Sequence, residues 1–193
     1  MSIVTLVSGG LDSTLMAVLA KEAGIKQFPL FVNYGQRSLN RELAACRRSM
    51  RHNRLPAPAI ANMAGFGTLI KSGLTDRTLH VVEDAFTPGR NLLFLLLGAA
   101  YAYEVGANAV TIGLLSERTS LFPDQTSHFI TMAESMLSEC MGRPIKILTP
   151  LGEFTKHDVV RLSRKRKIDG TYSCHVGKQV PCGRCISCRE FYF

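Results

Sequence analysis

The sequence predicts an α/β protein with a doubly wound parallel sheet and helices flanking both faces. The chain has 193 residues, a length that suits one such domain. Apolar residues make up 46% of it, which is enough to fill a core. Short runs rich in β-branched residues alternate with segments of helical spacing, and this alternation is typical of βαβ crossovers.

The first half of the chain begins this alternation. Residues 3–7 form a short apolar run that predicts a buried strand, and residues 13–23 have helical spacing that stops at Gly24. Residues 27–32 predict a second strand. Residues 39–52 predict a second helix, with apolar side chains on one face and basic ones on the other.

The second half of the chain continues the alternation of strands and helices after a long connection at residues 53–90. The expected elements are a strand at 57–61, a helix at 91–105, a strand at 109–114, a helix at 123–141 and a last strand at 146–148. We expect the helix at 91–105 to be buried on most sides. Thr155 is the expected N-cap of a further helix, with Asp158 in the place of the usual capping-box glutamate.

The chain is basic, with 23 Lys and Arg against 15 Asp and Glu, a net charge of +8 and a pI near 9.4. Such a surface favours polyanions, but net charge alone does not rank nucleotides, RNA, DNA and acidic proteins as partners. Residues 3–7 lack the basic flank of a signal peptide, and the longest apolar run, at 92–103, is far shorter than the ~20 residues of a membrane span. We therefore expect a cytoplasmic protein.

The segment between the first strand and the first helix reads Ser8-Gly9-Gly10-Leu11-Asp12-Ser13. Two glycines let a backbone approach a ligand closely, and amides at a helix start attract anions. The sequence thus predicts an ATP phosphate site. An acid beside phosphates is repulsive unless a cation intervenes, so Asp12 predicts Mg²⁺. The alternative is a plain Gly-Gly turn with Asp12 as a helix cap. The spacing fits neither a Walker loop nor a dinucleotide fingerprint.

Four cysteines near the end of the chain, Cys174, Cys182, Cys185 and Cys188, have the spacing C-x₇-C-x₂-C-x₂-C. This pattern predicts a closed structural zinc site, with His175 as a less favoured substitute ligand. A redox pair would not need four cysteines, whereas an iron–sulfur cluster remains an alternative. Cys46 and Cys140 lie in expected helices, and we expect them in the core. We divide the chain into an ATP-binding domain at 1–170 and a zinc segment at 171–193.

The phosphate loop resembles that of the PP-loop ATP pyrophosphatases, and with the cysteine tail the chain resembles the 7-cyano-7-deazaguanine synthase (QueC) family. The matching segments between them are Tyr34-Gly-Gln36-Arg37, Gly89-Arg90-Asn91, Ser120-Leu-Phe-Pro123-Asp124, Thr155-Lys156-His-Asp158 and Ser173-Cys174. They occur in the family's order over nearly the whole chain.

This resemblance implies an ATP-dependent C–N ligase. Members adenylate a 7-deazaguanine carboxylate, convert it to an amide with ammonia and adenylate again to give the nitrile, releasing AMP and pyrophosphate. By resemblance, residues 8–13 hold pyrophosphate, and Asp12, Arg90 and Lys156 are catalytic. The implied substrate-binding residues are Tyr34, Gln36, Asn91 and Asp124. The resemblance also implies a homo-oligomer.

The chain departs from the family pattern around the substrate pocket, at residues 125–128, at Leu121 and after Gly113. Three alternatives therefore stay open. The acceptor could be a protein amine, as in QueC-like enzymes of antiviral gene clusters. The protein could be a PP-loop tRNA-modifying enzyme, which its basic charge allows. It could also be a non-enzymatic zinc-knuckle protein that binds nucleic acid.

Overall fold

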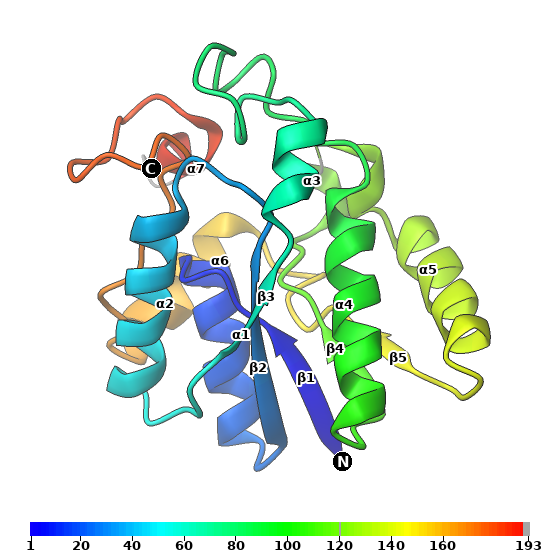
Figure 1. Ribbon diagram of the computed structural model, residues 1–193. Coiled ribbons are helices and arrows are strands. Elements are labelled where there is room, and N and C mark those ends of the chain that lie inside the picture. Colours follow the sequence, from blue (N-terminus) through cyan, green and yellow to red (C-terminus); the bar gives the residue numbers. More distant parts are fainter. Residues whose placement is uncertain (120, 191–193) are drawn as a thin grey trace.

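A computed structural model describes residues 1–119 and 121–190 of the chain. The described residues form a parallel sheet of five strands in the order β3-β2-β1-β4-β5 (Figure 1). The strands are β1 (Ser2–Leu6), β2 (Lys26–Asn33), β3 (Ala59–Asn62), β4 (Ala109–Thr111) and β5 (Lys146–Leu148). The parallel pairing confirms the predicted α/β class.

Helices cover both faces of the sheet, because side chains along a strand alternate between its two faces. On one face, Val4 and Leu30 pack with α4 (Arg90–Glu104) and α5 (Ser127–Cys140). On the other face, Val7 and Phe31 pack with α1 (Leu11–Glu22) and α2 (Leu39–His52). A third cluster joins α1 to α6 (Lys156–Lys165), and two short helices, α3 (Ala64–Leu69) and α7 (Ile186–Arg189), complete the set.

The strand order places a ligand site at one end of the sheet. From β1 the chain moves outward to β2 and β3, then returns to the other side of β1 as β4 and β5. Neighbouring loops therefore diverge beyond the carboxyl ends of β1 and β4, and open α/β sheets bind ligands at such a point. The predicted phosphate loop follows β1 directly, and Figure 1 shows the C-terminal tail at the same end of the molecule.

The prediction of a helix at 123–141 is wrong for the first turn of that range. Residues Pro123–Gln125 form a separate 3₁₀ turn, and Thr126 is extended with φ −90° and ψ 157°. The Thr126 hydroxyl accepts a hydrogen bond from the Phe129 amide at 3.1 Å, so it caps α5 and separates the two elements. The strand predicted at 109–114 is shorter as well, since β4 ends at Thr111.

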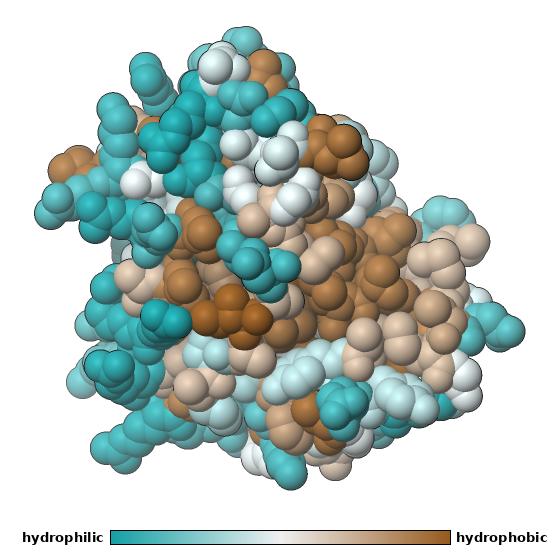
Figure 2. Space-filling view, in the orientation of Figure 1, coloured by the Kyte–Doolittle hydropathy of each residue, from teal (hydrophilic) through white to brown (hydrophobic). Residues whose placement is uncertain are grey.

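One of the burial predictions, that for Cys140, differs from the structure. Cys46 is buried as expected, but Cys140 is exposed at the last residue of α5. Helix α4 is covered on most sides, as expected, and one face of it, with Leu96 and Tyr103, is exposed. On α5, Met132 and Met136 also face solvent. Figure 2 shows apolar side chains gathered over α4 and α5. The homo-oligomer that the resemblance implies stays a prediction.

Within the described residues, no helix combines the length and apolar character needed to cross a membrane.

Candidate functional site

The loop after β1 is held by hydrogen bonds within six residues. The Ser13 hydroxyl accepts from the Ser8 amide at 3.1 Å and lies 3.1 Å from the Ser8 hydroxyl, which accepts from the Gly10 amide at 3.2 Å. Gly9 has φ +83°, and a Cβ built there would lie 2.4 Å from the Glu42 carbonyl oxygen. Only glycine suits both the backbone angle and the contact, so the loop wraps closely over α2.

Asp12 and Lys156 form an ion pair across 144 residues of sequence. The Lys156 Nζ lies 2.8 Å and 2.9 Å from the two Asp12 carboxylate oxygens, and 3.1 Å from Glu190 in the C-terminal tail. Burial acts to lower the pKa of Lys156, but the two carboxylates outweigh it and hold that pKa above its ordinary value. A positive charge is therefore fixed at the start of the phosphate loop helix.

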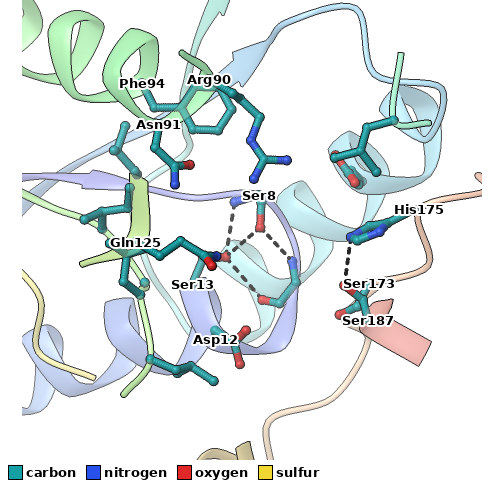
Figure 3. A pocket seen from close by; sticks show the side chains of 18 of the residues that line it. Ser8, Asp12, Ser13, Arg90, Asn91, Phe94, Gln125, Ser173, His175 and Ser187 are labelled. Atoms are coloured by element: carbon teal, nitrogen blue, oxygen red, sulfur yellow. Dashed lines mark hydrogen bonds between the residues drawn. The ribbon is translucent and has the colours of Figure 1, made fainter. Parts of the chain in front are cut away.

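Arg90 begins α4 and points into the same space (Figure 3). Its guanidinium carbon lies 5.8 Å from the Tyr34 ring centroid and 5.9 Å from that of Phe94, so two aromatic rings flank it. The Arg90 Nε is buried with no hydrogen-bond partner among the described residues. A buried guanidinium donor without a partner fits an anionic ligand.

These groups line one cavity of about 320 Å³. Of the predicted site residues, Ser8, Gly10, Asp12, Ser13, Tyr34, Gln36, Arg90, Asn91 and Lys156 line it. Gly9 and Leu11 belong to the loop but are outside this lining. Asp124 is also outside it, and the lining residue there is its neighbour Gln125, while the Asp124 carbonyl accepts from Asn91 Nδ2 at 3.0 Å.

Two predicted substrate residues are already engaged inside the protein. Gln36 is buried, and its amide group accepts from the Tyr34 amide and donates to the Val32 carbonyl and to Glu42. Tyr34 is buried too, and burial raises its pKa to about 12. The Tyr34 phenol is therefore neutral at physiological pH.

Two further residues line the cavity: Glu42, which the sequence interpretation missed, and His175, which it named only as a substitute zinc ligand. Glu42 lies on α2, and a charged residue on the buried side of that helix was the signal that could have found it. The His175 Nε2 lies 2.8 Å from the Ser187 hydroxyl, and its Nδ1 is buried without a hydrogen-bond partner among the described residues. Burial lowers the pKa of His175 to about 4.

The cysteine tail forms part of the cavity wall. Each of Cys174, Cys182, Cys185 and Cys188 offers a sulfur, and the four lie within 4.8 Å of one another. Tetrahedral zinc–thiolate geometry places sulfurs about 3.8 Å apart, so modest adjustment around an ion would suffice. The four thiols can thus hold a metal ion such as zinc. The Tyr172 amide donates to the Gly9 carbonyl at 2.9 Å, which joins the tail to the phosphate loop.

Comparison with known proteins matches residues 2–191 to the family model "Queuosine biosynthesis protein QueC". The chain belongs to the QueC family. A 7-cyano-7-deazaguanine synthase of Nautilia profundicola is 35% identical over 96% of this chain and 89% of its own length. Its counterpart in Nitratiruptor is 33% identical over 98% and 91%. These QueC relatives are named as synthases, which confirms the expectation of an enzyme.

Solved structures place the QueC-family chain among PP-loop folds. The U34-tRNA thiolase NcsA of Methanococcus maripaludis, with its [4Fe-4S] cluster, aligns with a TM-score of 0.57 at 16% identity, over 98% of this chain and 63% of that one. A 4-thiouridine synthetase in complex with RNA and ATP aligns with a TM-score of 0.55 at 20% identity, over 95% and 47%. At such identities the likeness shows the fold alone.

Proposed function

We propose that this chain adenylates 7-carboxy-7-deazaguanine with ATP and joins the activated carboxyl to ammonia. The amide so formed is adenylated again and converted to the nitrile, and each round releases AMP and pyrophosphate. The observation that carries this proposal is the meeting of the phosphate loop, Lys156 and Arg90 at one cavity. The names of the curated relatives support the choice of acid.

The phosphate loop, Arg90 and Lys156 suit the adenylation step of the reaction. The amides and hydroxyls of residues 8–13 bind the β- and γ-phosphates, which leave together as pyrophosphate. Arg90, whose Nε has no hydrogen-bond partner among the described residues, neutralises charge on the α-phosphate as the carboxylate oxygen attacks. Asp12 would hold Mg²⁺, which would supply positive charge to the phosphates, and Lys156 balances the charge of Asp12.

We assign substrate recognition to Tyr34 and Asn91, which line the cavity beside Arg90. The Asn91 side chain also holds the carbonyl of Asp124, the neighbour of Gln125. Asp124 remains a proposed contact for the base. Gln36 supports its neighbours: both hydrogens of its amide are used inside the protein, which leaves only one acceptor site on its oxygen for the substrate.

A protein amine is the second candidate acceptor. Leu121 lines the cavity and is 60% exposed, so the rim of the cavity at Leu121 is open to a large partner. The sequence departs from the family pattern in the same segment.

Free thiols at all described cysteines suit a cytoplasmic enzyme, because disulfides are rare in the cytoplasm.

The deciding experiment follows nucleotide products with and without 7-carboxy-7-deazaguanine and ammonium. We expect AMP and pyrophosphate that depend on the acid, and a base-derived amide or nitrile detected by mass spectrometry. ADP as the product would overturn the proposal. If AMP forms but no nitrile does, an added base in the intact mass of a co-purified protein would identify the protein-amine reaction.

A further inference from the structure

Glu42 places a carboxylate in the cavity wall that none of the roles above uses. Its Oε1 accepts a hydrogen bond from the Ser38 hydroxyl at 2.7 Å, and its Oε2 accepts from the Gln36 amide at 3.1 Å. No ion pair among the described residues includes Glu42. It is therefore a partly buried acid whose partners are neutral.

The carboxylate is fixed in orientation but retains capacity for a ligand. Gln36 is itself anchored, because it donates to the Val32 carbonyl at 3.3 Å and accepts from the Tyr34 amide at 3.0 Å. A carboxylate has about four acceptor sites, and the two neighbours occupy two of them. Burial raises the pKa of Glu42 above its usual range, although Ser38, Gln36 and Arg90 oppose the shift.

The position of Glu42 points to the reacting end of the cavity. The Glu42 carbonyl lies 2.4 Å from where a Cβ on Gly9 would be, so this turn of α2 packs directly on the phosphate loop. The Arg90 charge acts on both Glu42 and Tyr34. The Glu42 carboxylate therefore belongs to the same cavity as the phosphate loop and Arg90, where an adenylate would form.

We propose that Glu42 binds the attacking amine as its ammonium ion and removes one proton from it. This inference rests on the function proposed above. The Glu42 carboxylate takes a proton from ammonium, and the nitrogen lone pair then forms a bond to the acyl carbon of the adenylate. The bond between that carbon and the AMP oxygen breaks, and AMP leaves with the electron pair. The second proton lost by nitrogen as the amide forms passes to solvent.

The test separates activation of the acid from attack by the amine. The first is measured as acid-dependent exchange of pyrophosphate into ATP without any amine, and the second as amide formation with ammonium chloride at neutral pH. In Glu42→Gln we expect amide formation to fall about 100-fold, as for the loss of a general base. Pyrophosphate exchange should stay within about threefold of wild type.

Hydroxylamine provides a sharper comparison, because it is already neutral at neutral pH and needs no base before it attacks. Glu42→Gln should therefore keep most of the hydroxamate formation of the wild type. Raising the pH supplies free ammonia and should narrow the difference between variant and wild type in amide formation. Ser38→Ala keeps the carboxylate and should lower amide formation less than about tenfold. Glu104→Gln, on the exposed side of α4, serves as the charge control.

Equal losses of exchange and amide formation in Glu42→Gln would overturn the proposal, and would assign Glu42 to binding of the acid or ATP, or to capping of α2. An equal loss with hydroxylamine would overturn it as well. If the wild-type protein shows no acid-dependent exchange, the proposed function fails first and the role of Glu42 fails with it.

Discussion

The phosphate loop and the cysteine tail form two walls of one cavity, yet they obtain their shapes differently. The loop is held by hydrogen bonds between Ser8, Gly10 and Ser13, and it lies between a strand and a helix of the sheet. The tail has one short helix, and four sulfurs gather its residues around a site for a metal. The loop is thus preorganised by its local sequence, whereas we expect the tail to depend on a metal ion held by the four cysteines.

A few contacts join the phosphate loop and the cysteine tail beside the proposed catalytic residues. Glu190 of the tail pairs with Lys156, which pairs with Asp12 of the loop, and the Tyr172 amide bonds to Gly9. A disturbance of the tail should therefore reach the loop through these few contacts, while the loop itself should keep its fold. The predictions below test how independent the two regions are.

The largest effect is expected at Lys156, where loop and tail meet. Lys156→Met leaves Asp12 and Glu190 without their shared cation and removes a positive charge beside the phosphates. We expect acid-dependent AMP formation to fall about 1,000-fold. Lys165→Met, on the exposed end of α6, should leave the rate unchanged. A loss of less than tenfold would show that Lys156 only stabilises the fold.

The second-largest effect is expected on removal of the metal, which should affect the cysteine tail more than the phosphate loop. In Cys185→Ser, or after chelation, we expect bound metal to be lost and the tail to become sensitive to trypsin at Lys178 and Arg184. Activity should fall about 10- to 100-fold. ATP binding, measured by calorimetry, should weaken much less, because the loop keeps its own hydrogen bonds. Complete loss of ATP binding in a folded protein would contradict the independence of the loop.

Gly9→Ala tests the loop alone. The new Cβ would overlap the Glu42 carbonyl and the Cys46 amide at φ +83°. We expect the free energy of unfolding to drop by about 2 kcal/mol or more, measured with urea. Gly24→Ala is the matched control, because Gly24 has φ +68° with open space around it. Both variants carry the strain of positive φ, so their difference reports the contact between the loop and α2.

The smallest effect is expected at the cap of α6, the helix that carries Lys156. The Thr155 hydroxyl accepts from the Asp158 amide, and the Asp158 carboxylate accepts from the Thr155 amide at 3.1 Å. Thr155→Ala should lower the free energy of unfolding by about 1 kcal/mol. The metal content should stay the same, since the cap touches none of the cysteines. Reduced metal binding would show that the two regions are more tightly coupled than their contacts suggest.

The sequence by itself determined the parallel α/β class, the order of strands and helices, the phosphate loop and the cysteine set. These features are local: periodicity within an element, glycines at a turn and the spacing of four cysteines do not depend on distant residues. The capping box at Thr155 was predicted for the same reason and is confirmed.

Only the tertiary structure decided which groups meet. The pairing of Asp12 with Lys156 spans 144 residues, and no local pattern encodes it. Glu42, His175 and Glu190 became cavity residues because helix packing and the returning tail bring them there. The same holds for the errors: Thr126 caps α5 where periodicity continued a helix, and Cys140 is exposed on the outer side of the last turn of α5. Burial and pairing depend on the whole fold, which a one-dimensional pattern does not contain.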